Sequence, residues 1–252
     1  MRITVKSAPP PGPRHRTAEH PADGGPVQGP ERPEKRRARD HSRLLRRHRH
    51  GRWQTEPAGT AKDMPTKQAA AAVGQCELMY TYDKLFNEYN HTVAQVLLTG
   101  EDVKNEQRSR NMRNTIFRLL ELGALPVINE NDTVATDEVG VENTIGENDT
   151  LSAIVAAAVQ ADLLILLSDI DGQCDGDPHR DPTAKLIPVV PSIDAHILAL
   201  GGGSGSGLGT GGMATKLKAA QIVTEVGCQM VIANGSKPAL LYDIVGGKPV
   251  GT

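Results

Sequence analysis

Aromatic residues are scarce in this chain of 252 residues: they make up 3% of it, whereas hydrophobic residues as a whole make up 38%. A core must therefore be built from Ala, Val, Ile and Leu. No apolar run reaches the roughly 18 residues that a membrane-spanning helix needs. The cysteines Cys76, Cys174 and Cys228 are odd in number and widely spaced. That spacing excludes the usual metal-binding patterns, argues against a disulfide framework, and favours a reduced cytoplasmic protein.

The net charge of −2 conceals two parts of very different composition. Residues 1–62 hold 15 Lys and Arg against 6 Asp and Glu, a net charge of +9. Residues 63–252 hold 13 against 24, a net charge of −11. Nine of the 17 prolines also lie in the first part. Taken literally, the basic part indicates a disordered nucleic-acid-binding or targeting arm, and the acidic part indicates a soluble enzyme.

Helix and strand patterns alternate along the acidic part. The opening MRITVK predicts a short strand, and residues 7–61 show no persistent period. Thr66 is a plausible N-cap for the first long helix, and Ile116, Leu119, Leu120 and Leu122 are expected on the buried side of the second. The helix patterns cover 66–89, 101–123, 148–161 and 213–227, and the strand patterns cover 93–99, 124–130, 162–172 and 229–235. This alternation predicts an α/β fold with a mainly parallel sheet.

The stretch GGGSGSGLGTGGMATK is the sharpest chemical signal. Glycines let the backbone approach an anion closely, and the helix that follows offers free N–H groups and a positive dipole end. Lys216 lies about one turn into that helix, where it is placed to neutralise phosphate oxygens. Because Leu217 follows it rather than Ser or Thr, the stretch is not a Walker loop. A flexible linker is the alternative reading.

Polar residues lie at or just past the ends of two predicted strands and at the start of a predicted helix. Asn129 and Asp132 belong to the end of one strand, Ser168 and Asp169 to the end of another, and Asn148-Asp149 begins a helix. The carboxyl ends of parallel strands are where open α/β sheets bind ligands. These residues favour a site for a substrate that carries an amine or a carboxylate. Turn formation and helix capping are the structural alternatives.

The chain resembles the amino acid kinase family. The resemblance rests on KQAAAAVGQ, LLTGEDV, PVINENDTVAT, ENDTLSA, LLILLSDIDG, SGLGTGGMATKL and IANGSKP, from Lys62 to about Gly247. It implies a three-layer αβα sandwich that transfers the γ-phosphoryl group of ATP, with Mg²⁺, to the side-chain carboxylate of L-glutamate. In the family this reaction begins proline biosynthesis in the cytoplasm. Rival activities are the phosphorylation of acetylglutamate, carbamate or UMP, and a rival of another class is nucleic-acid binding by the basic arm.

The resemblance also implies roles for individual residues. Asp132 and Asn148 would bind glutamate, while Ser168 and Asp169 would contact the nucleotide. Lys216 and, by its place after the first strand, Lys6 would hold phosphate oxygens, and Asp149 would orient these lysines. The ATP loop would consist of Thr210, Gly211, Gly212, Met213, Ala214, Thr215 and Lys216. The expected partners are further copies of the chain, as a dimer or tetramer, and glutamate-5-semialdehyde dehydrogenase. No C-terminal accessory domain of the RNA-modification type is expected.

Residues 7–61 carry none of the expected family pattern, so we expect the kinase domain to begin at Lys62. Codon degeneracy offers an explanation, because Arg43 to His48 can be encoded CGT CTC CTC CGG CGC CAT. Read one nucleotide later, with Arg49 encoded CGG, these codons give Val-Ser-Ser-Gly-Ala-Ile, the expected loop after a strand. We therefore interpret 7–61 as the product of two compensating frameshifts. Such a chain would lack one core strand and its helix, and its activity would be impaired.

Overall fold

The computed structural model describes residues 1–7, 43–47, 53–57, 63–134, 148–176, 183–201 and 212–252. The chain divides into two compact units, which are described separately here. One unit joins Met1–Pro10 to Asn90–Thr252, and the other is Pro11–Tyr89. The expected boundary of the kinase domain at Lys62 stays a prediction. No helix in the described parts of the chain is long and apolar enough to cross a membrane.

The larger unit contains two parallel sheets. In the first, β1 (Ile3–Lys6), β6 (Leu163–Ser168) and β7 (Gln229–Asn234) lie in the order β1-β6-β7. In the second, β4 (Val93–Leu98) pairs with β5 (Leu125–Glu130). The helices of this unit are α2 (Gly100–Lys104), α3 (Glu106–Glu121), α4 (Asn148–Ala158), α5 (Ala195–Gly201), α6 (Met213–Glu225) and α7 (Leu240–Val245). These findings confirm the predicted α/β class and the parallel pairing.

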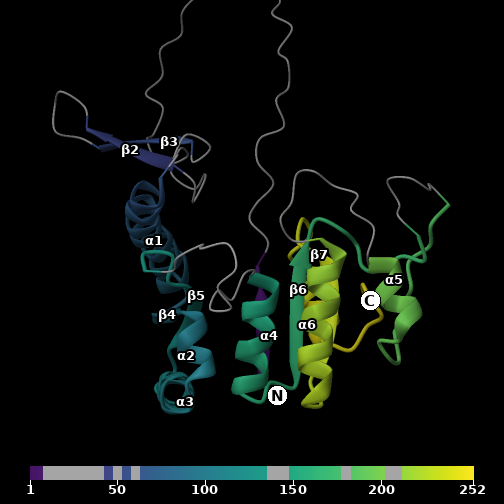
Figure 1. The fold of residues 1–252 in the computed structure, drawn as a ribbon. Coiled ribbons are helices and arrows are strands. Elements are labelled where there is room, and N and C mark those ends of the chain that lie inside the picture. Colours follow the sequence, from purple (N-terminus) through teal and green to yellow (C-terminus); the bar gives the residue numbers. More distant parts are fainter. Residues whose placement is uncertain (8–42, 48–52, 58–62, 135–147, 177–182, 202–211) are drawn as a thin grey trace, which may run out of the picture. The chain divides into compact units, whose positions relative to one another are not determined.

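Strand β6 is buried on both faces, as its unbroken apolar run predicts. Leu164 and Leu166 point into a core shared with α4 and α6, which run side by side in Figure 1. Leu163 and Ile165 pack on the opposite side with Ile244 of α7. The strand alternation therefore places helices on both faces of the sheet, which gives the three layers expected from the resemblance.

Strands β1 and β4 each pair on one edge alone among the described residues. Val5 of β1 is 46% exposed, although its neighbour β6 is buried throughout. Both sheets nevertheless contribute to one apolar core, because Leu98 of β4 and Met112 of α3 belong to the same cluster as Leu164. The larger unit thus has a common core but two separate sheets, and among the described strands β5 and β7 also pair on one edge only.

The smaller unit contains α1 (Met64–Asn87) and an antiparallel pair of strands, β2 (Arg43–Arg47) and β3 (Trp53–Pro57). The sequence showed no strand pattern there, so the absence of regular structure predicted for 7–61 is wrong at these two segments. The 24-residue helix α1 contains no buried residue. Its N-cap is Asp63, whose carboxylate accepts a hydrogen bond from the backbone N–H of Thr66 at 2.9 Å. The prediction of Thr66 as the cap is therefore wrong by three residues.

Two details of the second predicted helix also differ. The segment 101–123 forms two helices rather than one, because Asn105 has an extended backbone (φ −75°, ψ 120°) and caps α3 through its side chain. Ile116 is buried as expected, but Leu120 and Leu122 are 44% and 65% exposed. These leucines lie at the end of α3, where the chain leaves the core through Gly123 at φ +74°. Apolar character alone did not identify the buried face there.

Candidate active site

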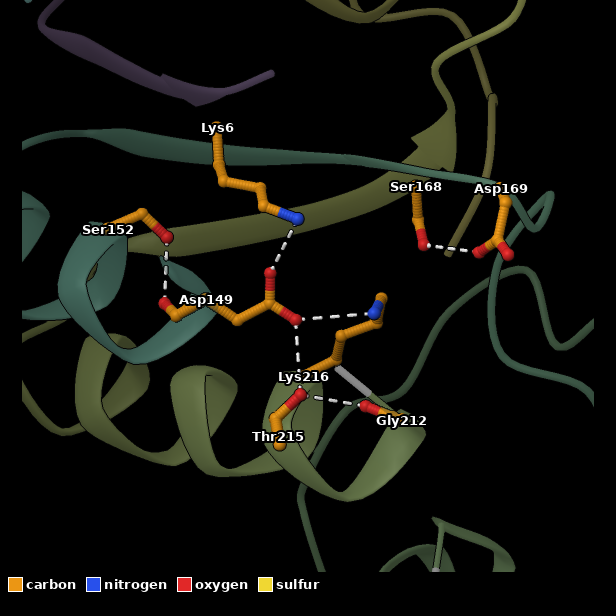
Figure 2. Close-up of polar contacts among 8 residues, drawn as sticks. All are labelled: Lys6, Asp149, Ser152, Ser168, Asp169, Gly212, Thr215 and Lys216. Atoms are coloured by element: carbon orange, nitrogen blue, oxygen red, sulfur yellow. Dashed lines mark hydrogen bonds and ion pairs between the residues drawn. The ribbon is translucent and has the colours of Figure 1, made fainter. Parts of the chain in front are cut away.

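The centre of the candidate site is Asp149, whose carboxylate lies between two lysines (Figure 2). Lys6 Nζ lies 2.9 Å from Oδ1 of Asp149, and Lys216 Nζ lies 3.2 Å from Oδ2. Asp149 is 3% exposed and Lys216 is 4% exposed, so both charges are withdrawn from bulk water. The structure thus brings together three residues that are separated by up to 210 positions in the sequence.

Each of these residues owes its place to the end of an element. Lys6 is the last residue of β1, Asp149 is the second residue of α4, and Lys216 is the fourth residue of α6. The two helices therefore direct the positive ends of their dipoles toward the edge where the parallel strands finish. Two lysines against one aspartate leave this cluster with a net charge of +1. An anion is the ligand that this arrangement favours.

The protonation of Asp149 reflects opposing effects. Burial would raise the pKa of its carboxyl, but the hydrogen bond from Lys6 and the charges of Lys216 and Lys6 outweigh burial. The pKa of Asp149 therefore lies below the ordinary value for aspartate. The group is a carboxylate at neutral pH, which it must be to hold two ammonium groups.

Two hydroxyl groups complete the surroundings of Asp149. Thr215 Oγ1 lies 3.2 Å from Oδ2 of Asp149 and 2.8 Å from the carbonyl oxygen of Gly212. Ser152 Oγ donates to the backbone carbonyl of Asp149 at 2.7 Å. Sequence reasoning did not single out Ser152. Its only signal was a position three residues after Asp149 on a predicted helix, which is too common to indicate a role.

The remaining ATP-loop residues are partly visible. Gly212 is the exposed N-cap of α6, with no side chain to cap the helix, and Met213 and Ala214 form its first turn. Lys216 in that helix is described, but Thr210 and Gly211 lie outside the described residues. The part of the loop that the structure describes is therefore a helix start, where the first backbone N–H groups lack the regular partners of a helix interior, and the N–H of Thr215 donates to the carbonyl of Gly212 at 3.2 Å.

Ser168 and Asp169 lie at the carboxyl end of β6, as predicted. Ser168 is buried, and its hydroxyl donates to Asp169 Oδ1 at 3.1 Å. The backbone N–H of Gly235, just past β7, donates to the carbonyl of Ser168 at 2.7 Å. Figure 2 shows this pair at the end of the strand, with no dashed line joining it to the contacts around Asp149. Ser168 and Asp169 thus occupy the strand edge next to the lysine–aspartate cluster without being part of it.

The two candidate glutamate ligands lie on different elements. Asn148 is the exposed first residue of α4, directly before Asp149. Asp132 is exposed in the turn that follows β5. The structure places both at the ends of elements, as the sequence predicts, and leaves their role as glutamate ligands a prediction. Within the described residues, no group of three or more His, Cys, Asp and Glu could hold a metal ion.

Comparison with known proteins agrees with this geometry. The model of the amino acid kinase family matches residues 31–234. The glutamate 5-kinase of Clostridium tetani is 52% identical over 191 residues, which cover 76% of this chain and 70% of the relative. The glutamate 5-kinase of Clostridium perfringens is 50% identical over 186 residues, covering 74% and 69%.

Among solved structures, an isopentenyl phosphate kinase superposes with a TM-score of 0.51 and 17% identity, covering 77% of this chain and 72% of that one. At this identity the likeness concerns the fold alone. The family match and the two bacterial relatives carry the assignment. The chain therefore belongs to the amino acid kinase family and, within it, to the glutamate 5-kinases.

Proposed function

We propose that this chain transfers the γ-phosphoryl group of ATP to the side-chain carboxylate of L-glutamate, giving L-glutamyl 5-phosphate and ADP. This is the first step of proline biosynthesis. The observation that carries the proposal is the pair of lysines on opposite oxygens of the buried Asp149. Phosphoryl transfer requires positioning and charge neutralisation more than covalent help from the protein, and this cluster offers both.

In the reaction, an oxygen of the glutamate carboxylate forms a bond to the γ-phosphorus. The bond between that phosphorus and the oxygen bridging to the β-phosphate breaks, and ADP leaves with the electron pair. Negative charge must be balanced on the transferred group and on the leaving oxygen. Lys6 and Lys216 would supply that balance from the two sides of Asp149, whose two carboxylate oxygens hold the ammonium groups apart.

The other candidates provide binding. Asp132 would pair with the α-amino group of glutamate, and Asn148 would donate its side-chain amide to a carboxylate. Ser168 and Asp169 would contact the nucleoside of ATP. The ATP loop from Thr210 to Lys216 would receive the phosphates, through backbone N–H groups that precede Thr215 and through the ammonium group of Lys216. The support is the position of the described residues at the carboxyl ends of strands and the starts of helices.

Magnesium is part of this proposal as a companion of ATP. Mg²⁺ commonly binds through substrate phosphates and one or two carboxylates and retains several waters, so a protein-built cage is not required. The exposed carboxylate of Asp169 at the end of β6 fits that requirement. When bound, Mg²⁺ would neutralise charge on the phosphates of ATP.

The test is a coupled assay of ADP release by the 252-residue chain with MgATP. Parallel reactions contain L-glutamate, N-acetylglutamate, carbamate, L-aspartate or UMP as the acceptor. Release that depends on glutamate, with formation of an acyl phosphate trapped by hydroxylamine, supports the proposal. Turnover with another acceptor and none with glutamate would place the chain in a different branch of the family.

The partners belong to the same proposal. L-Glutamyl 5-phosphate is a reactive acyl phosphate, so we propose that glutamate-5-semialdehyde dehydrogenase consumes it in the cytoplasm. A homo-oligomer, either a dimer or a tetramer, is also expected from the resemblance. Light scattering of the purified chain measures the oligomeric state, and a monomer at micromolar concentration would contradict this expectation.

A further inference from the structure

The hydroxyl of Thr215, a residue that the resemblance assigns to the ATP loop, contacts two oxygen atoms of the protein itself. Its hydroxyl lies 2.8 Å from the carbonyl oxygen of Gly212 and 3.2 Å from Oδ2 of Asp149. A hydroxyl carries one proton and can donate to only one of these acceptors at a time. Donation to the carbonyl one turn back is an ordinary local contact of helical threonine. The contact with Asp149 comes from another helix, 66 residues away in sequence.

From this geometry we infer that Thr215 is a positioning residue for the phosphoryl-transfer site: its hydroxyl holds Oδ2 of Asp149 when Lys216 turns toward a phosphate. The inference rests on the proposed function, because it assumes that Lys216 serves a phosphate during the reaction. It assigns Thr215 to the support of the lysines rather than to ATP itself.

The physical reason is the sharing of one carboxylate oxygen. Lys216 and Thr215 both approach Oδ2 of Asp149 at 3.2 Å, while Lys6 approaches Oδ1. If the ammonium group of Lys216 moves to a phosphate oxygen, Oδ2 loses its charged donor. A carboxylate that is 3% exposed has little water to replace that donor, so the loss is costly.

Thr215 is suited to replace Lys216 as the donor to Oδ2 of Asp149, because its short side chain stays in place when the ammonium group of Lys216 moves. The threonine side chain is short and restricted at χ1, whereas lysine is long and flexible. The proton of Thr215 can therefore alternate between Gly212 and Asp149 while its oxygen stays in place. With Lys216 on Asp149, the carbonyl of Gly212 accepts the proton. With Lys216 on a phosphate, Asp149 accepts it and stays aligned with Lys6.

Two pairs of variants of the full 252-residue chain separate this role from local capping. The test pair is Thr215→Val and Thr215→Ser. The control pair is Thr224→Val and Thr224→Ser in the same helix, where the hydroxyl lies 2.8 Å from the carbonyl oxygen of Ala220 and 3.2 Å from that of Gln221, with no contact to a carboxylate of the described residues. Valine removes the hydroxyl from a side chain of the same shape, and serine retains it.

The first measurement is urea unfolding. Because hydrogen bonds to charged groups contribute more than neutral ones, Thr215→Val should lower the folded-to-unfolded ratio about tenfold more than Thr224→Val does. Thr215→Ser retains the hydroxyl, so it should keep most of the stability that Thr215→Val loses. The difference between the losses caused by Thr215→Val and Thr224→Val should grow at least about threefold in a Lys216→Met background. There Thr215 is the remaining donor to Oδ2 of Asp149 among the described residues. Equal losses for the two valine variants, in both backgrounds, would overturn the inference.

The second measurement separates positioning from nucleotide contact. Thr215→Val should lower kcat about tenfold while the dissociation constant of ATP changes less than about twofold, and serine should recover kcat. A weakened affinity for ATP with kcat unchanged would show that Thr215 contacts the nucleotide, against our inference. If the parent chain shows no glutamate-dependent turnover, the proposed function fails, but the unfolding comparison still decides the role of Thr215.

Discussion

At the scale of single residues, the site depends on one carboxylate that serves two cations. Asp149 is buried, and the hydrogen bond from Lys6 together with the charge of Lys216 keeps its pKa below the ordinary value despite the opposing effect of burial. A lysine in such a pair cannot be removed without leaving the carboxylate short of a partner. Position and charge are therefore coupled, and a change at one residue should be felt at the others.

Replacing Lys216 with Met should lower kcat for glutamate phosphorylation by at least about 100-fold, because it removes a charge aimed at the transferred group. Steady-state kinetics with MgATP measures the effect. The matched control is Lys218→Met, two residues further along α6, where the side chain is exposed. Similar losses in both variants would contradict a specific role for Lys216.

The pKa of Asp149 predicts how the free energy of unfolding depends on pH. A carboxyl group whose pKa is lower in the folded state than in the unfolded state stabilises the folded protein. This contribution is complete when the pH lies above the pKa of the unfolded state, about 3.9, and it is lost as the pH falls through the pKa of the folded state. The variant Asp149→Asn has no carboxylate at this position and therefore lacks this contribution to stability. The difference in unfolding free energy between parent and variant should therefore shrink as the pH falls below about 4.

Urea unfolding from pH 7 downward measures that difference. The control is Asp83→Asn, at an exposed position on α1. A difference between the parent chain and Asp149→Asn that stays constant over the acid range would show that the charge of Asp149 contributes no net stability. The control variant should follow the parent chain at every pH.

At the scale of elements, β1 and β6 are neighbours with very different surroundings. β6 is buried from Leu163 to Ser168, whereas Val5 of β1 is 46% exposed and β1 pairs only with β6 among the described strands. Lys6, the last residue of β1, contributes to the site. A strand that is paired on one edge only, among the described strands, therefore holds one of the site residues. Such a strand is expected to fray more readily than its neighbour.

Leu164→Ala should lower the free energy of unfolding by about 2–5 kcal/mol, because it removes a fully buried side chain and leaves a cavity. Val5→Ala should cost less than about 1 kcal/mol, because much of the valine already faces solvent. Chemical denaturation of both variants measures the contrast. Comparable losses would mean that the side chain of Val5 is covered in solution, against its exposure of 46% in this structure.

At the scale of the whole molecule, the larger unit has one core and two parallel sheets with unpaired edges at β1 and β4. An added strand that paired with one edge of each sheet would join them into a single sheet. The interpretation of residues 7–61 as frameshifted predicts such a strand from the alternative reading.

The alignment with the Clostridium tetani relative covers 191 of the 252 residues, although the family model matches from residue 31. The boundary at Lys62 therefore stays a prediction.

A version of the chain with the alternative frame restored between codons 6 and 62 should be more stable to urea and more active with glutamate than the chain as written. The added strand would pair with the open edges and supply the Ser-Ser-Gly loop. Sequencing the DNA across these codons and assaying both proteins side by side measures this. Equal stability and activity, from a gene with an uninterrupted frame, would contradict the frameshift interpretation.

The sequence by itself determined most of the elements and the members of the site. Apolar runs and their period located β1, β4 to β7 and the helices α4 and α6, because local patterns decide where backbone hydrogen bonds can form. The lysines, Asp149 and the strand-end pair Ser168-Asp169 were identified by motif. The break at Asn105 and the exposure of Leu120 were missed, because capping and helix direction depend on neighbours that the pattern does not contain.

Only the tertiary structure decided the geometry around Asp149. It placed Lys6 and Lys216 on opposite oxygens and brought the hydroxyl of Thr215 to the same carboxylate. No local pattern could show this, because these contacts join β1, α4 and α6 across the sheet. The unpaired edges of β1 and β4 were likewise decided in three dimensions, since strand pairing is a property of the whole sheet rather than of any one strand.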